Sequence, residues 1–138
     1  MEYISKSIED TRDIGEKIAA KLNNGSVVAL FGGMGVGKTC ITTSIARSLG
    51  FEGEVSSPTF AVVNEYIGGK LPIAHFDMYR INDWNDLYST GYFDYIDRGF
   101  VVIVEWSENI ESVLEDDALR ITLEYIDETT RKITVSEN

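Results

Sequence analysis

The chain has 138 residues, 43% of them hydrophobic and 25% charged, which is the composition of an ordinary globular protein and predicts one domain spanning residues 1–138. Its 23 acidic residues outnumber its 12 basic residues and give a net charge of −11, which disfavours a broad nucleic-acid-binding surface on this chain alone. The single cysteine excludes an internal disulfide, and the lack of a long apolar run or a signal-peptide pattern predicts a cytoplasmic protein without a membrane span.

The N-terminal segment predicts a short strand followed by an amphipathic helix. Residues 3–5 are strand-like, and Ser7 is a candidate N-cap, with Asp10 in the capping-box position three residues later. Apolar residues recur every four positions at 14, 18 and 22, which predicts one buried helix face between Ile8 and Leu22. The polar sequence Asn-Asn-Gly that follows is typical of a helix end.

A glycine-rich loop follows the apolar, strand-like run 26–31. Residues 32–39 read Gly-Gly-Met-Gly-Val-Gly-Lys-Thr and fit the Walker A pattern G-x-x-x-x-G-K-[ST]. A helix is predicted from Cys40 to Leu49, so the loop joins a strand to a helix, as this motif requires. The alternative is a glycine-rich turn without a ligand, and it requires a chance match to the pattern. We therefore predict a nucleotide-binding site.

Each part of this loop has a chemical role in binding a nucleotide. Glycines let the backbone turn tightly and bring N–H groups close to a phosphate, with the positive end of the following helix behind them. Lys38 can reach the β- and γ-phosphates, and the Thr39 hydroxyl can ligate Mg²⁺. The predicted nucleotide-binding residues of the loop are Gly33, Met34, Gly35, Val36, Gly37, Lys38, Thr39 and Cys40.

The segment after the loop helix predicts an ordered turn and a β-hairpin. Pro58 favours an extended entry into a strand at 60–67. Thr59 beside it is either a sensor of Mg²⁺ and the γ-phosphate or an ordinary loop threonine. Two glycines at 68 and 69 separate that strand from a second one at 71–76, which predicts an antiparallel hairpin and hence a mixed sheet.

Two carboxylates directly follow predicted strands. Asp77 follows the strand 71–76, where it either faces a bound nucleotide, because α/β sites gather at strand ends, or serves as a turn or capping residue. The apolar run 100–104 ends in Glu105 and Trp106, which is the Walker B pattern, and Glu105 then holds Mg²⁺ directly or through water, or orients a water. His75 is the only histidine and, within a strand, is expected to be packed and not catalytic.

The remaining elements are short. A helix is predicted at 82–88, capped by Asn82 or Asp83 and ended by Gly91, and the aromatic residues at 92–96 are expected to pack. A second short helix runs from position 107 or 108 toward 114. Strands at 119–125 and 132–135 surround a polar turn at 127–130, which predicts a terminal hairpin that closes a sheet edge.

Four motifs stand in a fixed order along the chain: Gly-x-x-Gly-x-Gly-Lys-Thr, Ser-Pro-Thr-Phe, His-Phe-Asp-Met-Tyr-Arg and Val-Glu-Trp. Together they resemble the TsaE (YjeE) family, small ATPases of tRNA threonylcarbamoyladenosine synthesis, over nearly the whole chain. The resemblance implies an α/β, phosphate-loop NTPase-like three-layer fold with a mixed parallel and antiparallel sheet. It also implies ATP/ADP and Mg²⁺ as cofactors, slow ATP hydrolysis, and partnership with TsaD and TsaB, with tRNA contacted only through that complex.

The same resemblance assigns roles to individual residues. It implies that Lys38 binds phosphate, Thr39 and Glu105 hold Mg²⁺, and Asp77 is an essential acid near the γ-phosphate. Thr59 becomes a switch-like threonine and Trp106 the aromatic residue beside the acid. The chain departs from the usual loop in having Gly33 in place of an acid, Met34 in place of leucine and Cys40 in place of threonine, and none of these changes removes a phosphate-binding group.

Two other classes of function remain as alternatives. A small-molecule kinase needs an arginine-bearing lid, whereas the six arginines here are scattered and no long lid segment is present. The other alternative is a nucleotide-gated scaffold that does not hydrolyse ATP, in which Asp77 and Glu105 only adjust the binding of Mg²⁺. GTP is disfavoured as the nucleotide, because no Asn-Lys-x-Asp signature follows the loop.

Overall fold

A mixed β-sheet forms the centre of the molecule in the computed structural model, which describes residues 1–33, 35–56, 58, 63–78 and 80–137. Within these residues seven strands lie in the order β1-β7-β6-β2-β5-β4-β3. Their bounds are β1 Glu2–Ser5, β2 Val27–Phe31, β3 Val63–Tyr66, β4 Ile73–Asp77, β5 Val101–Glu105, β6 Leu119–Asp127 and β7 Thr130–Glu137. β2 pairs in parallel with both β5 and β6, and β4 pairs in parallel with β5, whereas the pairs β1–β7, β6–β7 and β3–β4 are antiparallel.

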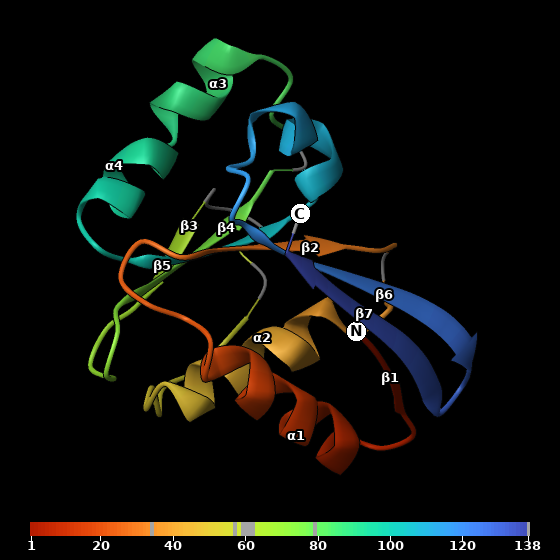
Figure 1. The fold of residues 1–138 in the computed structure, drawn as a ribbon. Helices are drawn as coiled ribbons and strands as arrows, with labels where there is room; N and C mark the ends of the chain where they lie inside the picture. The colour runs from red at the N-terminus through yellow and green to blue at the C-terminus, as the bar shows by residue number, and fades with distance from the viewer. Residues whose placement is uncertain (34, 57, 59–62, 79, 138) are drawn as a thin grey trace.

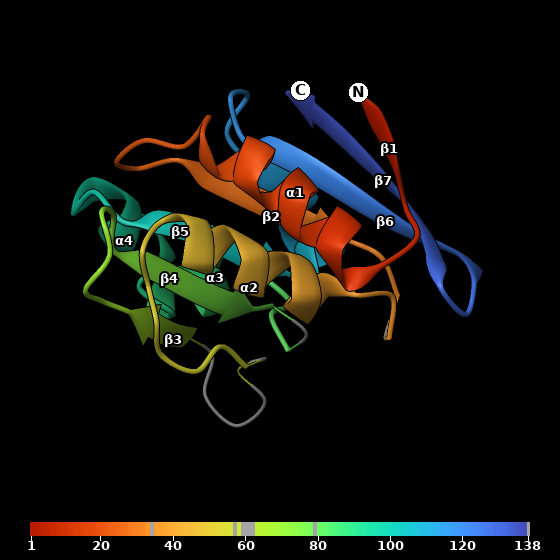
Figure 2. The ribbon, with the colours of Figure 1, turned by 90° about the horizontal axis from the view of Figure 1, so that it is seen from below.

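Helices cover both faces of this sheet and make three layers (Figure 1). The helices α1 (Ile8–Ala19) and α2 (Lys38–Ser48) lie on one face, below the sheet in Figure 1, and Figure 2 shows them side by side in front of the strands. The helices α3 (Trp84–Ser89) and α4 (Tyr92–Asp97) and the 3₁₀-helix η1 (Ser107–Val113) lie on the other. The central strands β2 and β5 are nearly continuous apolar runs, since a parallel strand between two helical layers is buried on both faces. The predicted α/β three-layer fold with a mixed sheet is therefore confirmed.

The first helix begins where its capping sequence predicts and ends earlier than expected. The Ser7 hydroxyl accepts a hydrogen bond from the Asp10 amide at 3.1 Å, and the Asp10 carboxylate accepts one from the Lys6 amide at 2.9 Å. The helix ends at Ala19, three residues before the predicted end at Leu22, because the chain tightens into i−3 hydrogen bonds there. Leu22 nevertheless stays in the core at 8% exposure, which is why the apolar repeat extends past the helix.

Close packing between α1 and α2 fixes the orientation of the helix that follows the glycine-rich loop. A Cβ added to Gly15 would lie 2.1 Å from the Ser44 hydroxyl oxygen, so only glycine fits at this crossing. That hydroxyl donates to the Arg12 carbonyl at 2.8 Å, which joins the two helices directly. Because α2 begins at Lys38, this contact also helps to hold the loop in place.

One sequence-based expectation is wrong, and the expectation that Gly91 ends a helix is confirmed and extended by the structure. The hairpin β6–β7 does not close a sheet edge: β6 pairs with β2, and β1 adds to the outer side of β7, so the edge strands among the described residues are β1 and β3. Gly91 does more than end a helix, since with a φ of 85° it is the N-cap of α4, a six-residue helix too short to show a periodic pattern. Part of the predicted strand 60–67 lies outside the described residues, and β3 covers its second half.

None of the helices in the described part of the chain is both long enough and apolar enough to cross a membrane.

Candidate nucleotide-binding site

The predicted site residues that the structure describes gather at the carboxyl ends of three neighbouring parallel strands. The glycine-rich loop leaves β2, Asp77 is the last residue of β4, and Glu105 is the last residue of β5. Asp77 and Glu105 are direct partners in the register of β4 with β5. Because parallel strands end at the same sheet edge, the loop and both acids meet there, which is where α/β proteins bind ligands.

The backbone of the loop has the conformation and the open space that a phosphate requires. Gly35 and Gly37 have positive φ angles of 73° and 106°, which side chains rarely allow. A Cβ added to Gly33 or Gly35 would meet no described atom within 4 Å, so the space beside this backbone is open. Gly37 caps α2 without any side chain, which leaves the N–H groups of the first turn for another acceptor. These features fit a bound phosphate.

Lys38 already lies across this loop. Its side-chain nitrogen donates to the Gly32 carbonyl at 2.9 Å and lies 4.7 Å from the centre of the Trp106 ring. The residue is only 7% exposed, so the ammonium group lies in a partly dehydrated position between the loop and β5. A phosphate could replace both contacts, because a negatively charged phosphate attracts the Lys38 ammonium group more strongly than a neutral carbonyl or an aromatic ring does.

The other predicted loop residues take different positions. Thr39 is exposed at the start of α2, and Val36 is buried with its carbonyl accepting from the Arg131 side chain at 3.1 Å. Cys40 is half-buried, and this burial raises the pKa of its thiol, opposed by the charge of Arg12. The raised pKa agrees with a packing role for Cys40. Met34 lies outside the described residues, and so does the predicted threonine Thr59.

The turn after β5 carries backbone strain at the site. Trp106 has φ 59° and ψ 42°, and it is the one non-glycine residue in the described part of the chain with a positive φ. A left-handed conformation costs a non-glycine residue about 1–2 kcal/mol. The Ser107 hydroxyl donates to the Val104 carbonyl at 3.0 Å and stabilises this tight turn. The strained turn places the indole of Trp106 against the Lys38 ammonium group.

Glu105 is buried, at 4% exposure, while Asp77 is half-buried. No group of three or more His, Cys, Asp or Glu side chains able to hold a metal occurs among the residues that the structure describes. Magnesium at nucleotide sites is held by one or two protein ligands together with phosphate oxygens. The donors Thr39 and Glu105, at the start of α2 and the end of β5, therefore fit a metal ion that arrives with a nucleotide.

Three residues that contact the loop, Glu105 or a neighbour of Glu105 were not predicted as site residues from the sequence. His75 was expected to be packed, and it is fully buried, but its ring also lies 2.6 Å from a Glu105 oxygen. Its position two residues before Asp77, on the same strand face, is a signal that could have pointed to the site. Tyr66 and Arg131 come from β3 and β7, and only the folded sheet brings them here.

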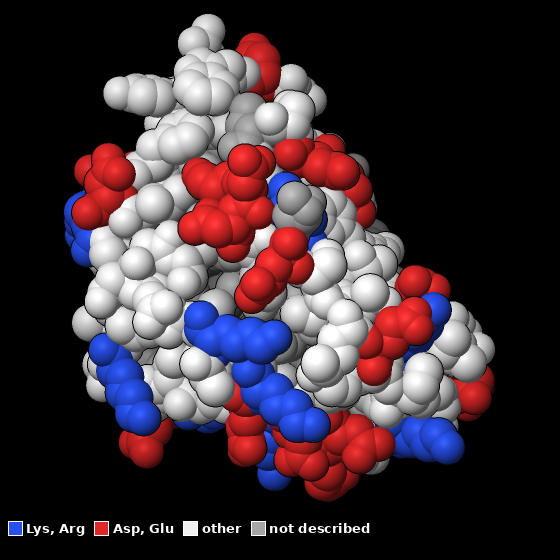
Figure 3. All heavy atoms as spheres, viewed as in Figure 1, with Lys and Arg blue, Asp and Glu red and all other residues white. Residues whose placement is uncertain are grey.

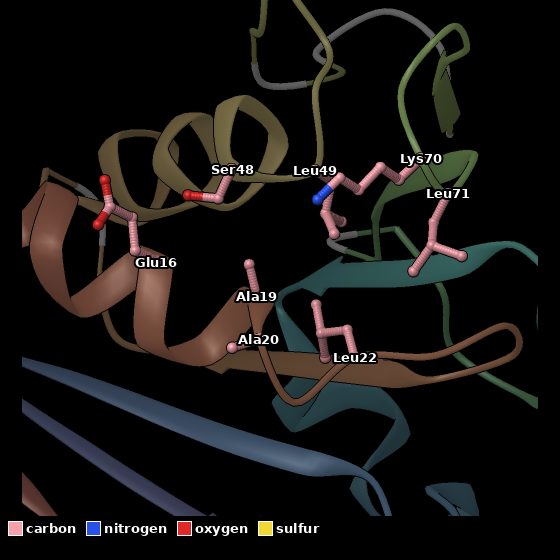
Figure 4. Close-up of a pocket in the computed structure, with 8 residues that line it drawn as sticks. All are labelled: Glu16, Ala19, Ala20, Leu22, Ser48, Leu49, Lys70 and Leu71. Carbon is pink, nitrogen blue, oxygen red and sulfur yellow. The ribbon is translucent and has the colours of Figure 1, made fainter.

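A separate hollow lies at the other end of α2 (Figure 4). Its lining includes Ser48 and Leu49 at the end of α2, Ala19 and Ala20 at the end of α1, and Lys70 of the β3–β4 hairpin. With 11 residues, α2 places this hollow about 16 Å from the loop. It contains none of the predicted site residues.

The fold and this sheet edge define an α/β protein of the phosphate-loop NTPase-like class. A family model described as Threonylcarbamoyl adenosine biosynthesis protein TsaE matches residues 5–133. The chain is 34% identical to the tRNA threonylcarbamoyladenosine biosynthesis protein TsaE of Treponema pallidum (strain Nichols), over 99% of this chain and 100% of that protein. It is 36% identical to the Bacillus subtilis (strain 168) protein of the same name, over 91% of this chain and 78% of that one.

A solved structure agrees with these sequence comparisons. The crystal structure of Bacillus subtilis YdiB superposes on the whole of this chain and on 86% of its own chain, with a TM-score of 0.83 and 30% sequence identity. The chain belongs to the TsaE family, a family of tRNA threonylcarbamoyladenosine biosynthesis.

Proposed function

We propose that this protein is a Mg²⁺-dependent ATPase that serves the TsaB–TsaD complex in the synthesis of threonylcarbamoyladenosine in tRNA. One observation carries the proposal: an open glycine-rich loop, a lysine and two carboxylates converge on one sheet edge, at the ends of β2, β4 and β5. Membership of the TsaE family supplies the pathway.

Each group has a role in this proposal. The loop N–H groups and the Lys38 ammonium bind the β- and γ-phosphates of ATP. The Thr39 hydroxyl and the Glu105 carboxylate hold Mg²⁺, which supplies positive charge to the phosphate oxygens when it is bound. Asp77 lies opposite Glu105 in the strand register and acts as the acid near the γ-phosphate. When ATP binds, Lys38 exchanges the Gly32 carbonyl and the Trp106 ring for phosphate oxygens.

The charge of the molecule supports an indirect relation to tRNA. Acidic side chains are spread over the face drawn in Figure 3, with lysine and arginine between them, and the chain carries a net charge of −11. Such a surface repels the phosphate backbone of RNA. We therefore propose that TsaD and TsaB contact the tRNA and that this protein acts on them, in the cytoplasm.

Substitution of the two acids tests the proposed roles. The variants Asp77→Asn and Glu105→Gln should keep nucleotide affinity within a few-fold and lose on the order of 10²-fold in the rate of phosphate release, because each acid acts on the metal or the reacting phosphate. The matched control is Asp94→Asn, which neutralises an exposed acid of α4. Wild-type hydrolysis by both site variants, with or without TsaB–TsaD, would contradict the assignment.

A further inference from the structure

A chain of hydrogen bonds connects Glu105 to the segment between α2 and β3. The Glu105 Oε2 atom lies 2.6 Å from His75 Nε2, and His75 Nδ1 lies 2.8 Å from the Tyr66 hydroxyl. That hydroxyl is 3.0 Å from the Ser56 carbonyl oxygen, which also accepts from the Asn64 amide at 3.1 Å. This series of hydrogen bonds therefore crosses β5, β4 and β3 and ends on the backbone at Ser56, in the connection between α2 and β3.

The three side chains in this network are almost completely buried. Glu105 is 4%, His75 0% and Tyr66 3% exposed, and the rest of the core around them is apolar. They lie on the sheet face that α2 covers, at diagonal positions of neighbouring strands, because Tyr66 is the register partner of Ile73 and Glu105 that of Asp77. Buried polar groups cost free energy unless they are hydrogen-bonded, so each member of this network depends on the next.

Counting donors and acceptors gives the network a direction. A carboxylate only accepts, so the proton between His75 and Glu105 belongs to Nε2 of the ring. The Tyr66 hydroxyl donates its one proton to the Ser56 carbonyl, so the Tyr66 oxygen accepts from an N–H group at His75 Nδ1. The Ser56 carbonyl accepts from both the Tyr66 hydroxyl and the Asn64 amide, so the hydrogen bonds run without a break from Glu105 to Ser56.

We propose that His75 and Tyr66 are positioning residues that hold the Glu105 carboxylate in one orientation and make this orientation depend on the position of the segment at Ser56. This inference rests on the proposed ATPase function, because it gives Glu105 an oriented role at the nucleotide. Partners that hydrogen-bond a metal-binding group are known to orient it, and their loss typically reduces metal affinity or activity by about 10–100-fold. A displacement of the backbone at Ser56 would then change the orientation of the Glu105 carboxylate through the Tyr66 and His75 side chains.

Steady-state kinetics with three variants tests the positioning role. His75→Leu removes both ring bonds, His75→Gln keeps an N–H group near the Nε2 position, and Tyr66→Phe removes only the hydroxyl while keeping the ring contact with Phe51. We expect kcat for ATP hydrolysis to fall about 10–100-fold in His75→Leu, with nucleotide affinity within threefold of wild type, and a partial recovery in His75→Gln. Tyr66→Phe should lower kcat by a smaller factor.

The matched control is Tyr92→Phe. The Tyr92 hydroxyl also donates to a carboxylate, that of Glu115 at 3.2 Å, but in the core on the other face of the sheet. This variant should leave kcat unchanged. An unchanged kcat in folded His75→Leu would overturn the proposal. A fall in nucleotide affinity and melting temperature together with kcat in His75→Leu would also overturn it, because a combined loss would indicate that His75 serves packing alone.

Nitrogen NMR provides a test that does not need ATP hydrolysis. His75 is the only histidine in the chain, so protein labelled with ¹⁵N-histidine gives one pair of ring signals. We expect a proton on Nε2 that is protected from exchange with water, and shifts of the ring signals in Tyr66→Phe and Glu105→Gln. An unprotonated Nε2, or a freely exchanging ring, would overturn the proposal. Wild-type protein that hydrolyses no ATP but shows the protected Nε2 proton would contradict the proposed function and leave the network itself supported.

Discussion

Removal of the Lys38 side chain is the substitution whose effect on nucleotide binding can be worked out most directly. In the structure Lys38 is 7% exposed, and its ammonium group is hydrogen-bonded to the Gly32 carbonyl at 2.9 Å and lies 4.7 Å from the centre of the Trp106 ring. A charge-assisted hydrogen bond to phosphate contributes about 1.5–3 kcal/mol. Because each 1.4 kcal/mol changes a dissociation constant tenfold, Lys38→Ala should weaken Mg·ATP binding by about 10–150-fold.

The stability of the free protein should change less than its affinity. The substitution removes one hydrogen bond and one cation–π contact, which together contribute about 1–2 kcal/mol, but it also removes the cost of holding a charge in a partly dehydrated position. We expect the free energy of unfolding to change by less than about 1.5 kcal/mol. Loss of binding without comparable loss of stability would identify Lys38 as a ligand contact.

Titration calorimetry with a non-hydrolysable Mg·ATP analogue measures this affinity. Lys17→Ala is the matched control, since the Lys17 nitrogen also lies over an aromatic ring, that of Tyr3 at 5.3 Å, but on α1 and away from the loop. The control should bind like wild type. A dissociation constant of Lys38→Ala within threefold of wild type would refute the assignment of this lysine to the phosphates.

Three further predictions concern other parts of the structure. Since the chain has two tryptophans, Trp84→Phe leaves Trp106 as the only indole, and its fluorescence should change when nucleotide draws the lysine ammonium away from the ring. An unchanged emission at saturating nucleotide would contradict that movement. Gly15→Ala should destabilise the fold by about 1–3 kcal/mol in urea unfolding, because the new Cβ would lie 2.1 Å from the Ser44 hydroxyl oxygen. Wild-type stability of this variant would show that the two helices separate without cost. Burial raises the pKa of Tyr92, with Glu115 adding to the effect, so the folded state favours the neutral phenol. This contribution to stability is complete below the ordinary pKa of about 10 and is lost as the pH rises above it, so stability should fall above pH 10 and fall less steeply in Tyr92→Phe. Equal slopes for the two proteins would contradict the raised pKa.

The sequence predicted those parts of the site that depend on local patterns. The glycine-rich loop is a contiguous motif, and its strand and helix follow from the neighbouring apolar runs. Asp77 and Glu105 were predicted to lie together because each comes at the end of a strand and parallel strands end at a common edge, and the register of β4 with β5 confirms this position. The helix cap at Ser7 and the hairpin between β3 and β4 were likewise predicted from neighbouring residues, and the structure confirms both.

The remaining features depend on pairings between distant segments. The contact of His75 with Glu105 requires the register of β4 with β5, which neither strand specifies by itself. The contact of Arg131 with the loop joins residues 95 positions apart, and no pattern near either residue indicates it. The edge position of β1 was missed for the same reason, since its partner β7 is the last strand of the chain.

Release of phosphate from Mg·ATP, measured for the protein alone and then with added TsaB–TsaD from the same organism, tests the central claim most directly. The proposed accessory ATPase should hydrolyse ATP slowly by itself and faster in the presence of the complex. A rate that does not rise, in a preparation that demonstrably binds ATP, would contradict the account and favour a nucleotide-gated scaffold or a small-molecule kinase.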